Sequence, residues 1–351
     1  MSRALLQHGM AVLLALAAAA AIVPHAQAGV GVTQLSVAGP GGPVTVFYPT
    51  NAPDRAVSRG PFALLLAEEA APVRGNNRLV VISHGSGGSP WSHSDLARTL
   101  VGAGFIVAAP RHHRDNATDP SRPGPASWKR RPAEVSRAID AVVADARFAP
   151  LLALDRVGVY GMSAGGHTAL SMAGGRWSPA QFRRHCEAHI DQDFPACVGI
   201  FTRLEGDAFD GTRKAVALAA LRLLFRDEAW QTHADPRVQA VVAAVPVAAD
   251  FDLASLARPR VPLGLVTAGR DQWLLPRFHS DALLAACRPR CTVIAALPQA
   301  GHGALLSPAP PAEVLPPIAA ELLADPPGFD RAQLPAVDRR IADFFTGHLL
   351  P

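Results

Sequence analysis

The stretch "VGVYGMSAGGHTAL" (residues 157–170) breaks off an apolar run at a serine that stands between glycines. The residues before the serine are typical of a buried strand, and the small residues after it suit the start of a helix. Gly161, Ser163 and Gly165 form a G-x-S-x-G pattern at this strand-to-helix turn. A serine in so sharp a turn is strained, and the glycines leave room for its hydroxyl to project above a sheet. The pattern gains meaning only if the rest of the chain supplies that sheet and partners for the hydroxyl.

Apolar runs and segments of helical periodicity alternate along the chain. We expect buried strands at 79–82, 105–109, 156–160, 240–247, 261–268 and 291–297. Apolar residues recur at helical spacing over 96–101 and 135–143, and Pro132 suits the first turn of the second helix. The runs at 30–37 and 44–49 are expected to add an edge hairpin. Strands that alternate with helices predict an α/β fold, with a mostly parallel, doubly wound sheet and helices on both faces.

A segment from about residue 176 to residue 238 departs from this alternation. It holds an apolar helix expected at 215–225 and two of the four cysteines, but no clear strand. An insertion here in a doubly wound sheet lies near the carboxyl ends of the strands, so we expect a lid, with a packing decoration as the alternative. Residues 29–351 are accordingly expected to form one domain with a lid insertion. The proline-rich run 307–317 indicates an irregular surface excursion.

Residues 1–28 have the layout of a secretory signal peptide. Arg3 precedes an apolar stretch from Met10 to Val23, and the small-residue pattern at 26–28 is typical of a cleavage site. The stretch is short for a membrane span, and a retained anchor is the alternative. We therefore expect a secreted or periplasmic protein without a stable membrane span after cleavage.

Export would place the four cysteines in a compartment where disulfides persist. Three connectivities are open, and the spacing favours local pairing of Cys186 with Cys197 and of Cys287 with Cys291. Zinc binding by the thiols is the alternative, but no partner CxxC or paired-histidine motif accompanies them.

The charge balance gives no strong signal for binding a polyanion. Of the 351 residues 18% are charged, and the net charge is +4. The one basic cluster, Lys129, Arg130 and Arg131, is interpreted as a solvated helix entrance rather than a nucleic-acid site.

A serine nucleophile needs a base, and the base needs a residue that orients it. In a sheet of this kind the order along the chain is Ser, then Asp or Glu, then His, on loops after later strands. Asp271 follows the strand expected at 261–268, and His302 follows 291–297 between two glycines that suit an open loop. Ser163, Asp271 and His302 are the predicted catalytic residues, with Asp250 as the competing acid.

Attack on a carbonyl group also requires backbone N–H groups that bind the oxyanion. Ala164, directly after Ser163, is the expected first donor. The second is expected from the loop "SHGSGG" (83–88), in which Ser86 is best placed. An ordinary glycine-rich turn is the alternative interpretation of this loop.

Three tryptophans, Trp91, Trp177 and Trp273, each follow a motif closely. They are candidates for lining a substrate pocket, with ordinary packing as the alternative.

The stretch "RHHRDN" (111–116) lies on the side of the sheet where the site is expected. His112 and His113 are weighed as metal ligands, but adjacent histidines point apart in extended backbone. An ion pair between Arg114 and Asp115 at the pocket rim is the preferred interpretation, and no metal site is predicted.

Four segments resemble the α/β-hydrolase superfamily: "VVISHGSGGSPWSHSDLARTLVGAGFIVAAPRHHRDN" (80–116), "DRVGVYGMSAGGHTAL" (155–170), "GRDQWL" (269–274) and "AGHG" (300–303). More narrowly, the chain resembles the exported, predicted dienelactone hydrolase-like group, which is related to platelet-activating-factor acetylhydrolases. The resemblance runs from about residue 40 to the C-terminus and implies a triad of Ser163, Asp271 and His302. True dienelactone hydrolases use a cysteine nucleophile, so the serine here separates the family label from any substrate.

Together these features predict a secreted serine hydrolase that cleaves small carboxylic esters through an acyl-enzyme, without a metal or an organic cofactor. Apolar residues of the insertion favour uncharged, moderately hydrophobic substrates. A secreted serine peptidase, a lipase or phospholipase-type acyl hydrolase, and a non-catalytic binding protein on the same fold are the alternatives. The oligomeric state does not follow from the sequence.

Overall fold

The computed structural model describes residues 29–37, 39 and 41–351, so the predicted signal peptide lies outside the described residues. In the described chain, ten strands form one sheet in the order β10-β9-β8-β7-β5-β6-β2-β1-β4-β3. Six of these strands run parallel as predicted: β5 (Leu79–Ser83), β6 (Ile106–Pro110), β7 (Val157–Met162), β8 (Val238–Ala244), β9 (Leu263–Ala268) and β10 (Cys291–Leu297). Every residue of β5, β6 and β7 is buried, which explains why their sequences are apolar throughout instead of alternating. The prediction of an α/β fold is confirmed.

The N-terminal strands extend the sheet further than the sequence indicated. The predicted hairpin forms from β1 (Gly29–Leu35) and β2 (Val44–Thr50), which pair antiparallel, and β2 continues the sheet beside β6. This hairpin is not the edge, because β4 (Phe62–Glu68) pairs with β1 and β3 (Arg55–Arg59) pairs with β4. The turn between β3 and β4 contributes to the cavity described below.

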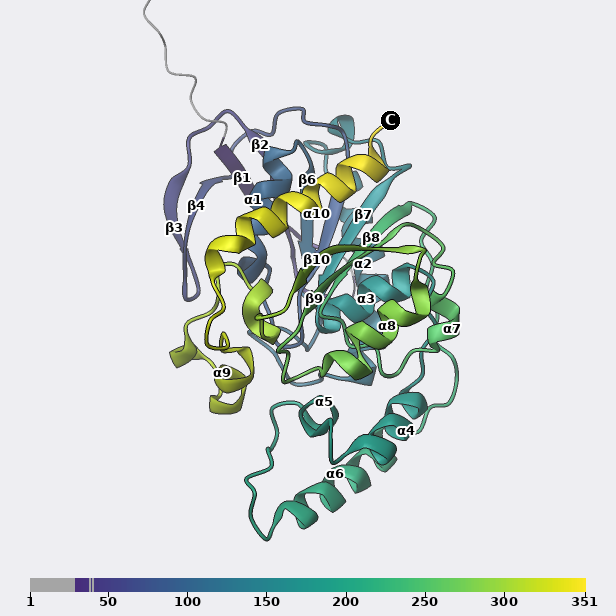
Figure 1. The fold of residues 1–351 in the computed structure, drawn as a ribbon. Helices are drawn as coiled ribbons and strands as arrows, with labels where there is room; N and C mark the ends of the chain where they lie inside the picture. The colour runs from purple at the N-terminus through teal and green to yellow at the C-terminus, as the bar shows by residue number, and fades with distance from the viewer. Residues whose placement is uncertain (1–28, 38, 40) are drawn as a thin grey trace, which may run out of the picture.

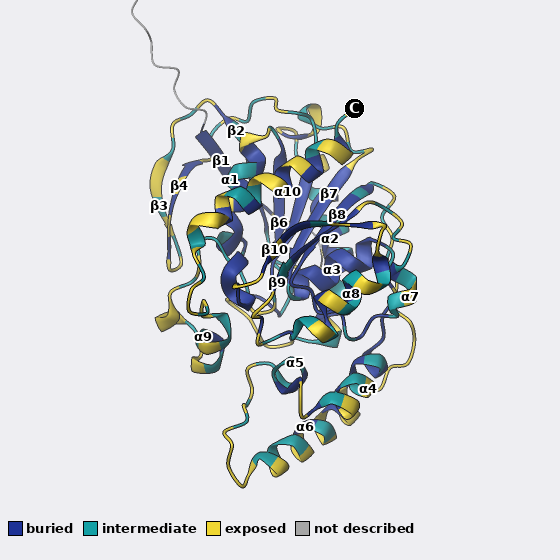
Figure 2. Cartoon of the chain, in the orientation of Figure 1, coloured by how far each residue is buried: buried dark blue, intermediate teal, exposed yellow. Residues whose placement is uncertain are grey.

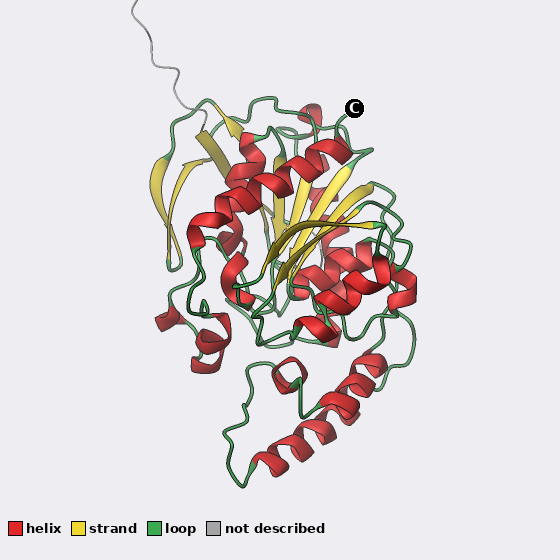
Figure 3. Cartoon of the chain, in the orientation of Figure 1, coloured by secondary structure: helices red, strands yellow, loops and turns green. Residues whose placement is uncertain are grey.

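Helices cover both faces of the sheet (Figure 1) and leave the strands in the middle of the molecule (Figure 3). On one face lie α1 (Ser94–Gly102) and α10 (Leu334–Leu349), whose apolar residues share a core cluster with Val80, Tyr160 and Val242. On the other face lie α2 (Pro125–Ala144), α3 (Ala164–Met172) and α8 (Ser280–Cys287). Two short helices complete the periphery, α7 (Leu253–Leu256) and α9 (Pro317–Leu323).

The helix α2 differs from its prediction in two ways. It begins at Pro125 and not near Pro132, which lies inside the helix. Pro125 occupies the first helical position that was assigned to Pro132. The basic cluster therefore lies within the helix, and Arg131 is fully buried, whereas a solvated helix entrance was expected. Asp115 offsets part of the free-energy cost of burying this charge, because its carboxylate lies 2.8 Å from the guanidinium.

The inserted segment forms a helical arm, which we define as α4 (Pro179–His189), α5 (Phe194–Val198) and α6 (Asp210–Leu224) with the loops between them. Figure 1 shows the arm projecting from one end of the domain, and Figure 2 shows that its surface is largely exposed or intermediate while the central strands are buried. Several large apolar side chains of the arm are exposed, including Phe201, Phe209 and Leu224.

The two disulfides have the expected local pairing. Cys186 of α4 is bonded to Cys197 of α5, and Cys287 at the end of α8 is bonded to Cys291 at the start of β10. Within the described residues, no helix has both the length and the apolar character needed to cross a membrane.

Candidate active site

Ser163 occupies the sharp turn between β7 and α3 that its sequence predicted. Its backbone has a φ of 58°, in the region that non-glycine residues rarely adopt. A Cβ atom at Gly161 would lie 1.9 Å from the carbonyl oxygen of Gly165, and one at Gly165 would lie 1.8 Å from that of Ser83. Both glycines are therefore required by the close approach of backbones, and this crowding holds the serine in its strained conformation.

The structure brings Asp271 and His302 together across two adjacent loops. Nδ1 of His302, after β10, lies 2.7 Å from Oδ2 of Asp271, after β9. The other carboxylate oxygen accepts hydrogen bonds from the backbone N–H groups of Trp273 (2.9 Å) and Leu274 (2.8 Å). Both oxygens of Asp271 are thus fixed by donors, and the ring of His302 is oriented by a carboxylate in the manner of a general base.

His302 is less open than its glycine neighbours suggested. It begins a short 3₁₀ helix, His302–Leu305, and is only 2% exposed, because the ring of Trp273 packs against it with 5.2 Å between the ring centroids. The exposed edge faces a cavity that Ser163 also lines. Nucleophile and base candidates therefore meet at one cavity.

Asp250, the competing acid, lies elsewhere. Its Oδ2 is 2.8 Å from Nε2 of His167 on α3, and both side chains are fully buried. The ring of His167 packs against Trp177, with 4.6 Å between centroids. Asp250 is thus committed to a second histidine within the core, and the acid beside His302 is Asp271.

The cavity has a volume of about 660 Å³ and extends over the carboxyl ends of the central strands. Its polar floor includes Ser86, Ser163 and His302. Apolar side chains dominate its walls, and they come from five separate segments: Phe62, Trp91, Ile200, Trp273, Leu306, Val314, Leu315 and Leu323. A volume in this range fits a ligand of small-molecule size.

The inserted segment was predicted to cover the cavity, but most of the covering residues come from another part of the chain. The helical arm supplies Ile200, whereas the proline-rich run and α9 supply residues from Leu306 to Leu323. The sequence marked this run as an irregular surface excursion because it is rich in proline. Its position after His302 is the signal that it lies beside the site.

Two of the three candidate tryptophans line the cavity. Trp91 and Trp273 do so, but Trp177 does not. Trp177 is 2% exposed and packs in the core against Trp128 and His167. Its assignment to the substrate pocket is therefore corrected to core packing.

The loop after β5 lies beside Ser163, as expected for a source of an oxyanion donor. Ala164 begins α3 directly after the serine, and Gly85 and Ser86 line the cavity. The Ser86 hydroxyl donates to Oδ1 of Asp115 at 2.6 Å, and the Gly87 N–H donates to the same oxygen at 3.0 Å. The buried carboxylate of Asp115 thus anchors this loop through two hydrogen bonds.

The predicted ion pair in "RHHRDN" has a different partner. Asp115 pairs with Arg131 of α2 at 2.8 Å, while Arg114 donates to the Ser121 hydroxyl at 3.0 Å. The preferred pairing of Arg114 with Asp115 was therefore wrong, and the partner of Asp115 is Arg131, which was expected to lie in solvent.

His112 is enclosed by two polar side chains rather than open to a metal. Its Nε2 lies 2.8 Å from the Ser83 hydroxyl, and its Nδ1 lies 2.6 Å from Glu134. Burial, and after it the charge of Arg131, lower the pKa of His112 well below its ordinary value. The backbone N–H of His113 donates to Glu134 as well, at 3.2 Å. Both ring nitrogens of His112 are therefore engaged in a structural network behind the site.

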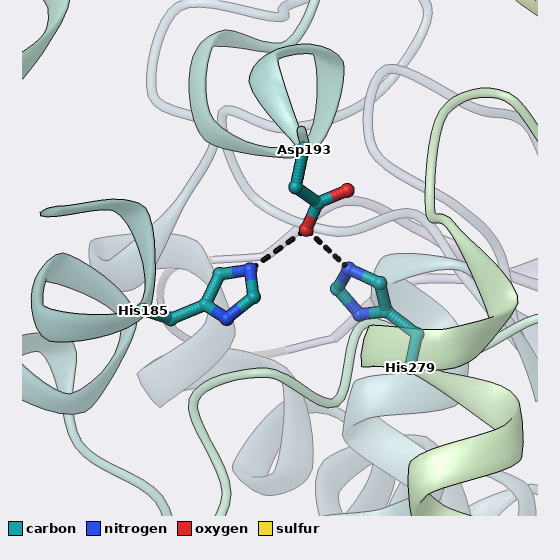
Figure 4. Close-up of side chains that lie close together, drawn as sticks. All are labelled: His185, Asp193 and His279. Atoms are coloured by element: carbon teal, nitrogen blue, oxygen red, sulfur yellow. Dashed lines mark hydrogen bonds and ion pairs between the residues drawn. The ribbon is translucent and has the colours of Figure 1, made fainter. Parts of the chain in front are cut away.

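A cluster of metal-ligating side chain types joins the helical arm to the sheet domain (Figure 4). Nε2 of His185 lies 2.7 Å from Oδ2 of Asp193, and Nε2 of His279 lies 3.3 Å from the same oxygen. Burial alone would raise the pKa of Asp193, but hydrogen bonds from the two histidines outweigh it and lower the pKa to about 2.

The hydrogen bonds of this cluster fit a polar link between the arm and the sheet domain better than they fit a metal centre. The backbone N–H of Ala248 donates to Nδ1 of His279 at 3.0 Å, so the proton of the neutral ring resides on Nε2. A metal ion would need the lone pair of that Nε2, and His279 would first have to give up its bond from Ala248. The cluster, His185, Asp193 and His279, is a hydrogen-bonded link between α4 and the start of α8.

Among the described residues that line the cavity, the charged side chains are all positive. Among its described lining residues there is no Asp or Glu, whereas Arg59 and Arg111 are present. Arg59 pairs with Glu68 on the neighbouring strand and lies over the ring of Trp91, 5.5 Å from its centroid. The lining therefore offers no counter-charge to a cationic ligand.

The chain is similar in structure to a ferulic acid esterase from Streptomyces cinnamoneus, solved at 2.4 Å resolution. The TM-score is 0.54 and the identity 18%, over 94% of this chain and 92% of that one. A likeness at this identity shows the fold alone, and it agrees with the α/β architecture described above. No protein-family model matches the chain, and no curated protein matches it. The narrower resemblance to the dienelactone hydrolase-like group stays a prediction.

Proposed function

We propose that the chain is a serine hydrolase of carboxylic esters, with Ser163 as nucleophile, His302 as base and Asp271 as the residue that orients it. The observation that carries the proposal is the 2.7 Å hydrogen bond between His302 and Asp271 at the same cavity that Ser163 lines. The strained backbone of Ser163 supports it, because strain of this kind is found where a side chain must be presented to a substrate. The likeness to an esterase agrees with the reaction class.

The proposed reaction is acyl transfer to water. His302 takes the hydroxyl proton of Ser163 as the oxygen attacks the ester carbonyl, and Asp271 stabilises the resulting imidazolium. The N–H groups of Ala164 and Ser86 bind the oxyanion of the tetrahedral intermediate. His302 returns the proton to the leaving alcohol, and a water activated by the same ring then releases the acid.

We further propose that the substrates are small esters without a positive charge. The cavity walls are mainly apolar and aromatic, and no carboxylate lines them to balance a cation. The panel of test substrates includes a feruloyl ester, because the similar structure is named a ferulic acid esterase.

Export and a lid role for the insertion are part of the proposal. Residues 1–28 have the layout of a signal peptide, and two disulfides suit an oxidising compartment. Ile200 of the arm lines the cavity, which supports a contribution of residues 176–238 to its covering.

The test is hydrolysis of p-nitrophenyl esters of increasing acyl length and of methyl ferulate, by residues 29–351 and by the Ser163→Ala variant. We expect turnover by the wild type and a loss of at least about 10³-fold in the variant, at unchanged folding by circular dichroism. Labelling by a fluorophosphonate should also require Ser163. A folded Ser163→Ala protein that keeps most of the activity would exclude the proposed nucleophile, and a wild type that neither turns over nor labels would favour a binding protein.

A further inference from the structure

Asp115 and Arg131 form the only ion pair of the described chain in which an arginine and a carboxylate are both fully buried. Such pairs are costly to desolvate, and apolar residues of similar size often fit a core as well. Burial alone would raise the pKa of Asp115, but the charge of Arg131 and hydrogen bonds to the carboxylate outweigh it and keep the pKa well below its usual range. The pair is therefore charged inside the protein, next to the loop that lines the cavity.

Most contacts of the Arg131 guanidinium are with this loop and with Asp115, which also contacts the loop. It donates to the carbonyl oxygens of His84 and Gly85, the latter at 3.3 Å, as well as to Asp115. Its Nε donates to the Ser127 hydroxyl at 2.9 Å. An ordinary core residue could fill this volume, but it could not hold two carbonyl groups on one side of the loop.

The carbonyl oxygen of Gly85 accepts from three donors. These are Nδ1 of His84 at 2.7 Å, the N–H of Gly88 at 3.1 Å and the Arg131 guanidinium at 3.3 Å. In a trans peptide unit the C=O and the following N–H point in opposite directions. Fixing the Gly85 carbonyl toward Arg131 therefore directs the N–H of Ser86 away from Arg131.

The loop that carries this peptide lies against the nucleophile. A Cβ atom built on Gly85 would lie 3.4 Å from Cβ of Ser163 and 3.9 Å from its hydroxyl oxygen, so the loop passes directly beside the serine. Asp115 secures the loop a second time through the Ser86 hydroxyl and the Gly87 N–H. A rotated peptide would present the Gly85 carbonyl to the cavity, and a carbonyl would repel an oxyanion.

We propose that Asp115 and Arg131 are positioning residues that hold the Gly85–Ser86 peptide with its N–H toward Ser163, as the second oxyanion donor. This inference rests on the proposed function and adds a pair of residues that do not touch the substrate. Loss of one oxyanion donor costs about 10²–10³ in kcat in enzymes of this mechanism. The pair should therefore act on kcat and leave substrate binding nearly unchanged.

The experiment compares Asp115→Asn, Arg131→Lys and the double variant Arg131→Met/Asp115→Leu with the wild type. The double variant removes both charges and leaves none buried alone, so it tests the role even where a single variant fails to fold. We measure kcat and KM for p-nitrophenyl butyrate, urea unfolding, and the affinity of a trifluoromethyl ketone, which adds to the serine and develops an oxyanion. We expect kcat and ketone affinity to fall by about 10², with KM within about threefold, in folded protein.

The matched control is Asp250→Asn, which alters another fully buried carboxylate, paired with His167 at 2.8 Å. It should lower stability but leave kcat and ketone affinity within about threefold, because its pair does not contact the loop. A folded double variant with wild-type kcat would overturn the positioning role, as would an equal loss of ketone affinity in Asp250→Asn. A wild type without Ser163-dependent turnover overturns the proposed function together with this inference, whereas normal wild-type turnover with unaffected variants overturns this inference alone.

Discussion

Two regions of the molecule are held in place by different means: the elbow, by which we mean the sharp turn 161–165 around Ser163, and the helical arm. All nine residues of α3, which follows the elbow, are buried, and backbone atoms approach Gly161 and Gly165 so closely that no side chain fits. In α6 of the arm only two of fifteen residues are buried, Ala217 and Leu221. Inside the arm the Cys186–Cys197 disulfide joins α4 to α5. The arm is joined to the sheet domain by the hydrogen-bonded bridge through Asp193 and by apolar packing, such as that of Phe182 against Trp128 of α2. The elbow is thus packed closely on every side, while most of α6 is open to solvent, and substitutions should affect the two regions differently.

The largest effect on kcat is expected from a substitution of Asp271, the carboxylate beside His302. Asp271→Asn keeps the shape of the side chain but no longer selects the correct tautomer of His302, so kcat for a p-nitrophenyl ester should fall by about 10⁴. Asp250→Asn, the matched change at the competing acid, should lower kcat by no more than a few fold. If Asp250→Asn proves the more damaging of the two, Asp271 is not the acid of the triad.

Glycine substitutions test the difference in packing directly. In Gly165→Ala the new Cβ would lie 1.8 Å from the Ser83 carbonyl oxygen, so the free energy of unfolding should fall by about 3 kcal/mol or more, with loss of activity. In Gly211→Ala, at the start of α6, the new Cβ has no neighbour within 4 Å, and stability should be unchanged or raised by up to about 1 kcal/mol. Urea unfolding measures both, and a comparable loss in the two variants would refute the proposed contrast.

The arm's cross-link is tested by the Cys186→Ser/Cys197→Ser double variant. The disulfide closes a loop over a sequence separation of 11, for which chain entropy predicts a stabilisation of about 2–3 kcal/mol. Because the disulfide joins α4 to α5, the loss should appear as faster hydrogen exchange over these two helices, with hydrolysis of short esters within a few fold of wild type. Cys287→Ser/Cys291→Ser is the control outside the arm. Collapse of short-ester turnover in the arm variant alone would show that the arm shapes the catalytic floor.

The candidate site residues that the structure brings together share one property: each follows a parallel strand. Apolar residues fill most positions of β5, β7, β9 and β10, so these strands stand out in the sequence, and the polar residues directly after them converge at one edge of the sheet. Asp271 and His302 were found by this order, and their hydrogen bond agrees with it. Their role in catalysis stays a proposal that the variants above test.

The features that the sequence did not predict depend on pairing across the chain. Arg131 looked solvated because its charge is visible in the sequence and the burial of its partner Asp115 is not. The walls from Leu306 to Leu323 lack periodicity, and only the fold brings them over the cavity. Trp177 follows the elbow closely in sequence but packs into the core, because α3 carries the chain away from the cavity. Distance along the chain is therefore a poor guide to the walls of the cavity, whereas the order of the strands located its polar floor.

The smallest expected effect concerns a carboxyl group on the sheet face opposite α3. Burial, and after it the charge of Asp95, raise the pKa of Asp338 on α10 from 3.8 to about 7. Between these pH values the unfolded chain releases a proton that the folded protein keeps, so this group lowers stability as the pH rises. Asp338→Asn cannot ionise, and it should raise the free energy of unfolding by about 1–2 kcal/mol at pH 8 but by little at pH 4. Urea unfolding at the two pH values measures the difference, and Asp343→Asn on the same helix is the control. An equal gain at both pH values would mean that packing, and not ionisation of Asp338, sets the stability of this face.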